Sequence, residues 1–295
     1  MAVRYERAEI QQSLGRGAGD VWPVQDAERR GDWILFAFEE RRIYAPLEHE
    51  ELPHQFARCA TNDASLLTFV KHNGRLGWRD LNAASDRMAD TWLEQQAWHL
   101  TQLAPEFGLG QLYAEPVEWI RAHAATVAWC LEAAHVLGIS DARIRNRRCS
   151  ELLYDRFPDA VGKCGTIQHL SVARMIPAKI ALRTAVAGMV RALLEQNLTG
   201  VRRRLRVDGQ GRLQSVWAGS SLIESIYTLI TDAITSGRLA RCQYCGAGFI
   251  QTDRRQRYCP PPEDKDKSDC MNRDRVGRQR RIPKGHNGKS KTRTR

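Results

Sequence analysis

The chain has 295 residues, 42% of them hydrophobic, and a formal net charge of +11. This length can bury a sizeable core, and the organisation of the chain favours two domains. No stretch approaches the roughly 18 consecutive apolar residues of a transmembrane helix, and the opening MAVRYERAEI lacks the apolar run of a signal peptide, so we expect a cytoplasmic protein without a membrane partner.

The first predicted elements are a small hairpin and two helices. DWILFAF and RRIYAP have the composition of short strands on either side of two glutamates, which predicts a hairpin near 32–46. Apolar residues at helical spacing predict a helix over 85–104. A clearer helix over 116–138 begins at Pro116 and ends at Gly138, because proline is tolerated in a first turn and glycine is a natural C-terminal stop.

Three further elements lead toward the C-terminus. A proline-started, glycine-ended pattern predicts a helix over 177–200. VRRRLRV and RLQSVWA flank a glycine-rich turn, which predicts a hairpin near 201–218. An S-x-x-E capping pattern opens a predicted helix over 221–237. The expected fold class is mainly α with short β-hairpins, and residues 1–237 are expected to form a mostly helical domain.

This helical domain carries no signature of catalysis. It has no Gly-rich phosphate loop, no Ser/His/Asp arrangement and no paired carboxylates, so we expect no enzymatic activity and leave its ligand open. Its scattered cysteines, tryptophans and histidines lack metal-ligand spacing, and we interpret them as buried thiols and as core or surface residues. These residues are Cys59, Cys130, Cys149, Cys164, Trp92, Trp98, Trp119, Trp129, His99, His123 and His135.

The cysteine spacing near the C-terminus predicts a metal site. Residues 242–270 contain the pattern C-x2-C-x13-C-x10-C. A C-x2-C pair places two thiolates on one tight turn, and a second pair from a distant segment completes a tetrahedron that leaves no position for water. We therefore expect one structural zinc ion, the alternatives being a redox C-x2-C pair or chance clustering. The predicted ligands are Cys242, Cys245, Cys259 and Cys270, with Phe249 and Tyr258 as apolar cover.

The same segment resembles a known family. The resemblance is carried by Cys242-x2-Cys245-Gly246, Phe249, Arg254-Arg255, Tyr258-Cys259 and Cys270-Met271-Asn272-Arg273. These motifs are similar to the C-terminal zinc finger of the bacterial CGNR family, most strongly over 220–281, although Met271 stands where the family has glycine. The resemblance implies a treble-clef-like or zinc-ribbon-like finger with four cysteine ligands over 238–282, after a helical domain, in a stress-induced transcriptional regulator that binds DNA through the finger.

The charge distribution points to the same partner. Residues 238–295 hold 17 Lys and Arg against 6 Asp and Glu, so this segment carries the whole net charge and residues 1–237 balance at zero. Such a segment attracts polyanions, with nucleic acid the usual partner. We expect a basic helix from near Ser268 through Arg281 and a disordered basic tail over 283–295. The predicted nucleic-acid contacts are Arg254, Arg255, Arg257, Arg273, Arg275, Arg278, Arg280 and Arg281.

Asn272 lies two residues after the last cysteine, and its side chain has a predicted role of its own. We predict that Asn272 supports the site from outside the ligand shell by bonding the loop or a sulfur, and contact with adenine is the alternative. The expected function is a DNA-binding transcriptional regulator whose helical domain senses a ligand or mediates self-association. The alternatives are an adaptor or RNA-binding protein, a His-metal nuclease, and a basic tail that only aids solubility. The nuclease would need a histidine beside the metal-binding helix, whereas His286 lies in the tail after Pro283.

Overall fold

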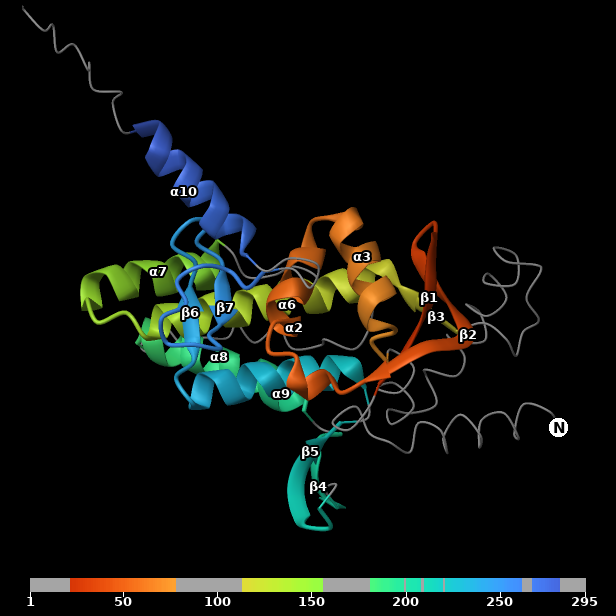
Figure 1. Cartoon of the computed structure of the whole chain (residues 1–295). Coiled ribbons are helices and arrows are strands. Elements are labelled where there is room, and N and C mark those ends of the chain that lie inside the picture. Colours follow the sequence, from red (N-terminus) through yellow and green to blue (C-terminus); the bar gives the residue numbers. More distant parts are fainter. Residues whose placement is uncertain are drawn as a thin grey trace, which may run out of the picture.

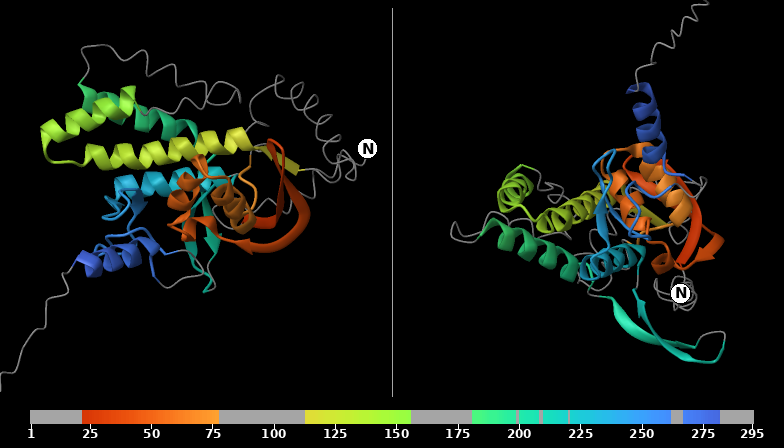
Figure 2. Two further views of the ribbon diagram at one scale, coloured as in Figure 1. Left: turned by 90° about the horizontal axis from the view of Figure 1, so that it is seen from above. Right: turned by 60° about the vertical axis from the view of Figure 1, so that its left-hand side comes forward.

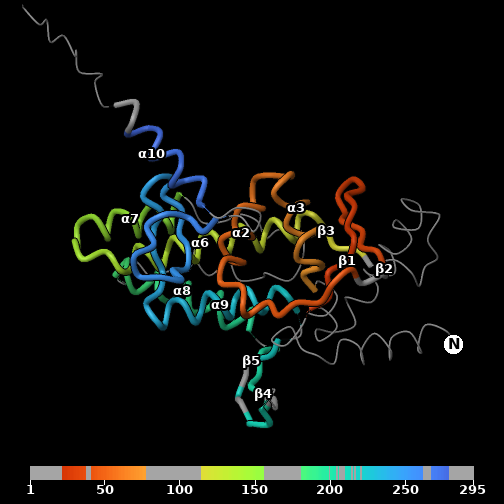
Figure 3. The backbone as a smooth tube through the Cα atoms, in the orientation of Figure 1, coloured from red at the N-terminus to blue at the C-terminus, as the bar shows by residue number. Residues whose placement is uncertain are grey.

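The computed structural model describes residues 22–77, 113–155, 181–198, 200–207, 210–219, 221–261 and 267–281. In these residues a small sheet lies at one end of a helical body, and the cysteine-bearing segment lies at the other (Figure 1). Figure 3 traces the same path through the Cα atoms. Several predictions fall outside the described residues: the helix over 85–104 with Trp92, Trp98 and His99, the tail with His286, and Cys164.

The N-terminal sheet has three antiparallel strands in the order β1-β2-β3. Its strands are β1 (Trp22–Arg30), β2 (Trp33–Tyr44) and β3 (Tyr113–Pro116). A two-residue loop joins β1 to β2, and its Gly31 has a φ of 57°, a left-handed conformation that glycine adopts without steric cost. β3 pairs with the first residues of β2 and leads directly into the central helix.

The predicted hairpin near 32–46 is wrong, because this segment is one continuous strand. β2 has 12 residues and pairs with β1, which has 9. The pairing register shifts on both sides of Gln25, so the additional residues of β2 are taken up as a bulge near Glu39 and Glu40. The two glutamates that suggested a turn therefore mark an irregularity within a strand.

The helical body is built from short elements that lie between β2 and β3 in the sequence and from four longer helices that follow β3. The short elements are η1 (Pro46–Glu48), α2 (Leu52–Ala57), η2 (Arg58–Ala60) and α3 (Asp63–Asn73). The longer helices are α6 (Val117–Leu137), α7 (Ala142–Tyr154), α8 (Leu182–Gln196) and α9 (Leu222–Thr235). Sequence periodicity did not predict α2, α3 or α7, and α2 is too short to show an apolar period.

Helix α6 confirms the prediction for 116–138, with Pro116 at the N-cap and Gly138 at the C-cap. Helix α9 confirms the capping pattern, because the Ser221 hydroxyl accepts a hydrogen bond from the Glu224 amide at 3.3 Å. The prediction for 177–200 is wrong at its start. Helix α8 begins at Leu182 and ends at Gln196, and Ala181 before it is not helical (φ −58°, ψ 132°); Pro177 itself lies outside the described residues.

The predicted hairpin near 201–218 is confirmed. Strands β4 (Arg202–Val207) and β5 (Leu213–Ala218) pair with each other in antiparallel fashion, from Arg202 opposite Ala218 to Val207 opposite Leu213. This two-stranded ribbon projects away from the helical body (Figures 1 and 2).

One apolar core connects the sheet to all four long helices. It includes Trp119 and Trp129, as expected for core tryptophans, and it extends as far as Ile250 near the cysteine cluster. His123 is also buried; its ring bonds the Tyr227 hydroxyl at 3.1 Å, and burial lowers its pKa to about 3. None of the helices in the described ranges is long and apolar enough to cross a membrane.

Candidate metal centre

The first two cysteines lie on a tight turn between two short strands. β6 (Leu239–Arg241) and β7 (Gly248–Ile250) pair antiparallel, and the turn between them contains Cys242 and Cys245. The amide of Gly246 donates to the Cys242 carbonyl at 3.0 Å, and Gly246 has a φ of 75°. The turn folds back because glycine takes this left-handed conformation at little cost.

The other two cysteines come from a loop and a helix. Cys259 lies in the loop after β7, which is tied to the turn by a hydrogen bond from the Gln243 amide to the Arg257 carbonyl at 2.9 Å. Cys270 lies in the first turn of α10 (Asp269–Arg281), where the prediction placed the basic helix. The buried Ser268 precedes this helix, and its hydroxyl accepts from the Met271 amide at 3.5 Å.

The four sulfur atoms converge. The Sγ atoms of Cys242, Cys245, Cys259 and Cys270 all lie within 4.8 Å of one another, and those of Cys245 and Cys259 are 3.4 Å apart. With zinc–sulfur bonds of about 2.3 Å, a tetrahedral site separates neighbouring sulfurs by about 3.8 Å. The cluster is therefore compatible with one four-coordinate zinc ion. The described residues contain no other such group of three or more His, Cys, Asp or Glu side chains.

The electrostatics of the thiols favour a bound cation. Burial opposes ionisation of Cys242, but backbone amides of Cys245 and Cys259 donate to its sulfur and lower its pKa to about 7. Burial, followed by the sulfurs of Cys245 and Cys242, raises the pKa of Cys259. The same causes raise the pKa of Cys270 to about 12. Neighbouring thiolates repel one another in this cluster, and a divalent ion at its centre would remove that repulsion.

Phe249 and Tyr258 cover the site, as the sequence predicts. Phe249 is fully buried and packs with Cys242 and Cys259. The Tyr258 hydroxyl donates to the Asp274 carboxylate at 2.7 Å and accepts from Arg278 at 3.4 Å, and Arg278 pairs with Asp274 at 2.8 Å. These contacts connect the loop to α10, and we call them the Tyr258–Asp274–Arg278 clamp. One arginine of the helix, Arg278, therefore takes part in an internal contact.

The cysteine-bearing segment is packed onto the helical body. Ile250 belongs to the main core, and Gly248 lies so close to α6 that a Cβ atom there would approach Leu131 to 3.2 Å. His54 of α2 donates to the Gly248 carbonyl at 3.0 Å, and burial lowers the pKa of this imidazole. Arg238 pairs with Glu50 and with Asp232. Sequence reasoning missed this junction, because His54 and Gly248 are 194 positions apart.

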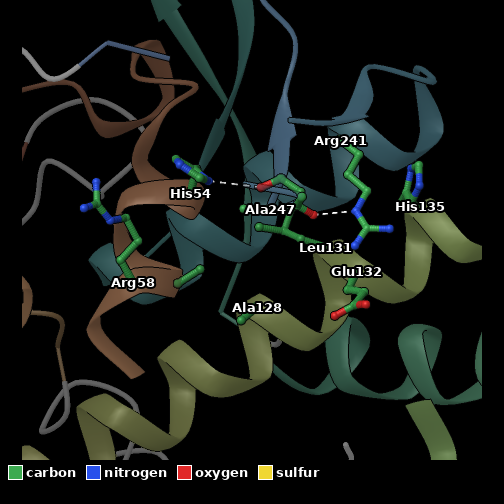
Figure 4. A pocket seen from close by; sticks show the side chains of 11 residues that line it. His54, Arg58, Ala128, Leu131, Glu132, His135, Arg241 and Ala247 are labelled. Carbon is green, nitrogen blue, oxygen red and sulfur yellow. Dashed lines mark hydrogen bonds between the residues drawn. The ribbon is translucent and has the colours of Figure 1, made fainter. Parts of the chain in front are cut away.

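A pocket of about 240 Å³ lies at this junction, between α2, α6 and the cysteine-bearing turn. Figure 4 shows Glu132 and His135 of α6 on one side and His54 on the other, with the Arg241 side chain turned back to the Gly246 carbonyl. Glu132 pairs with Arg148 at 3.0 Å. The pocket thus touches the backbone that directly follows Cys245.

Most of the predicted nucleic-acid contacts lie at the surface. The exposed ones are Arg254, Arg255, Arg257, Arg273, Arg275 and Arg278. The side chains of Arg280 and Arg281 are outside the description, although both residues are in α10. Asn272 is exposed, and within the described residues its side chain makes no hydrogen bond to the cysteines. Its supporting role stays a prediction.

The remaining cysteines fit their interpretation as inert thiols. Cys59, Cys130 and Cys149 are buried and unpaired. Burial raises the pKa of Cys59 and of Cys130 to about 12, so both remain neutral thiols at physiological pH.

Comparison of the chain with protein-family models, curated proteins and solved structures finds no match. The functional assignment therefore rests on the site itself and on the motifs within residues 220–281.

Proposed function

We propose that this chain is a zinc-finger protein that binds duplex DNA, a bacterial transcriptional regulator of the CGNR type. The observation that carries the proposal is the position of α10. The predicted ligand Cys270 lies in the first turn of this helix, which exposes Arg273 and Arg275, so a metal ion bound there would fix the base of a basic helix. In both views of Figure 2, α10 stands clear of the helical body.

Zinc has a structural role in this proposal. The four thiolates fill its coordination sphere, so its contribution is to hold the turn, the loop and α10 together. A ligand in the first turn of a helix favours the treble-clef-like form of the finger over the ribbon-like form, in which the ligands come from turns. The Tyr258–Asp274 contact holds α10 at a second point, four residues beyond Cys270.

The exposed arginines supply the DNA contacts. A guanidinium group can bind a phosphate or the guanine O6 and N7 edge, and a helix fits the major groove. Arg254, Arg255 and Arg257 form a second basic strip on the loop. If about six arginines bind phosphates, the logarithm of the binding constant should fall with the logarithm of salt concentration at a slope near −5.

The helical part is proposed to sense a small ligand or to mediate self-association. The pocket beside His54 and His135 supports the first role, because a ligand there would touch the backbone after Cys245. The second candidate function is an adaptor or RNA-binding protein, which the same arginine-bearing surface would also serve. A nuclease has less support, because the described residues place no histidine among the four cysteines.

Fluorescence anisotropy with labelled duplex DNA and with structured RNA tests the proposal. We expect duplex binding with a steep salt slope, lost with chelator or with Cys270→Ser. Arg273→Gln/Arg275→Gln should keep zinc and lower the slope by about 2. Arg143→Gln/Arg183→Gln, which removes equal charge from exposed positions on α7 and α8, is the matched control. Salt-independent binding, or a preference for RNA, would overturn the DNA assignment.

A further inference from the structure

The β4–β5 ribbon is an arginine-rich element that lies outside the cysteine-bearing segment. Residues 201–219 contain five arginines and one acid, Asp208, although residues 1–237 as a whole balance at zero. The ribbon, like α7 with its four arginines and one glutamate, therefore concentrates positive charge within a part of the chain whose total is zero. A cluster of this kind attracts a polyanion.

The ribbon also exposes large apolar side chains. Leu205 is 73% exposed, Leu213 68% and Trp217 45%. Strand pairing places Arg203 directly opposite Trp217, and the Arg203 guanidinium lies 4.8 Å from the centre of that ring. Among the described residues, these exposed leucines are not part of the core, which on β5 begins at the buried Ala218.

The base of the ribbon is held firmly. The buried Glu224 of α9 accepts a hydrogen bond from the Gly200 amide at 3.0 Å, just before β4. The same side chain packs against Gly219, just after β5, where a Cβ atom would approach it to 3.1 Å. One carboxylate thus contacts both ends of the ribbon and sets the direction in which it leaves the body.

We propose that the β4–β5 ribbon is a second DNA-binding element, which inserts into a groove of duplex DNA separately from α10. This inference rests on the proposed function of the finger. A two-stranded ribbon fits the major groove, its arginines reach phosphates and base edges, and exposed leucines supply apolar contacts to bases. Figure 1 shows the ribbon and α10 leaving the body on opposite sides, so the two elements contact different stretches of duplex.

Charge argues against a second copy of the chain as the occupant. A twofold interface brings the same patch of two subunits together, so a dimer formed through the ribbon would juxtapose two sets of arginines. DNA instead supplies one negative charge for about every 1.7 Å of its axis. The arginine content of 201–219 therefore favours phosphate as the partner.

The test uses two ribbon variants of the full-length, zinc-loaded protein. Arg202→Gln/Arg203→Gln should weaken duplex binding on the order of tenfold and lower the salt slope by about 2, since each phosphate contact contributes about 0.9. Leu205→Ser/Leu213→Ser should weaken binding with an unchanged slope, because it removes uncharged contacts. Both pairs are exposed, and unchanged circular dichroism and zinc content would show that the fold is retained. Arg143→Gln/Arg183→Gln is again the control.

The outcomes separate the two proposals. If the wild-type protein binds no duplex, the proposed function fails. If Arg273→Gln/Arg275→Gln weakens binding and neither ribbon variant does, the finger assignment stands and the ribbon proposal is overturned. Ribbon variants that bind duplex normally but dissociate an oligomer in sedimentation experiments would also overturn it, in favour of self-association. Ribbon variants that lose binding to RNA but keep duplex binding would overturn the ribbon proposal as well.

Discussion

At the scale of single residues, Gly246 decides the shape of the cysteine-bearing turn. Its φ of 75° follows directly on Cys245, and its amide closes the turn on the Cys242 carbonyl. A Cβ atom here would approach the Arg241 guanidinium to 3.1 Å, which a flexible side chain can relieve. The remaining cost is backbone strain.

Gly246→Ala should therefore weaken zinc binding about tenfold, because a left-handed conformation costs an L-residue about 1–2 kcal/mol and metal binding is coupled to folding of the turn. Competition titration against a chromophoric chelator measures this. Gly277→Ala is the control: Gly277 lies in α10 with open space around it, so alanine should stabilise the helix and leave zinc affinity intact. Equal affinities for Gly246→Ala and wild type would refute the strain argument.

At the scale of elements, α10 meets the cysteine-bearing segment at two points: Cys270, whose sulfur joins the four-cysteine cluster, and the Tyr258–Asp274–Arg278 clamp. The helix is composed mainly of polar residues, and most of its described side chains are exposed, including Met271 and Val276. Its order therefore depends on these attachments more than on packing.

Tyr258→Phe removes the hydroxyl that bonds Asp274 and Arg278. We expect faster amide hydrogen exchange across α10 and several-fold weaker DNA binding, with zinc stoichiometry unchanged because the ligands are untouched. Tyr244→Phe is a suitable control, since Tyr244 is 47% exposed on the turn between β6 and β7 and is not one of the three clamp residues. Exchange in α10 that is equal in both variants would mean that Cys270 alone orders the helix.

At the scale of the whole molecule, the finger and the helical body share a core. Ile250 packs in the main core, Gly248 contacts Leu131, and His54 bonds the finger backbone. Loss of the metal should therefore reach the body through these contacts, because residues in one packed network do not respond independently.

Chelation should lower the melting temperature of the helical body by several degrees. The near-ultraviolet circular dichroism signal of the buried Trp119 and Trp129 measures this transition. A stabilisation of about 4 kcal/mol is expected when zinc exceeds its dissociation constant about 1,000-fold. Cys242→Ser/Cys245→Ser, which has no complete site to empty, should not respond to chelator. If chelator leaves the melting temperature of the helical body unchanged in the wild type, the cysteine-bearing segment and the helical body unfold separately.

Patterns of short range were readable from the sequence. The cysteine spacing, the cap at Ser221, the ends of α6 and the start of α10 near Ser268 all depend on neighbours within a few residues, and the structure bears them out. The errors arose where pairing decides the outcome. The segment near 32–46 looked like two strands, and only its partner β1 makes it one strand with a bulge.

The sequence by itself singled out the four cysteines of the cluster, because residue type and spacing are written into one short segment. It also placed the charge at the C-terminus and in β4. Only the tertiary structure decided how the finger is seated, since His54, Leu131 and Gly248 meet through folding of distant segments. It likewise decided that β4 and β5 stand away from the core, because exposure depends on what the rest of the chain covers and not on local pattern.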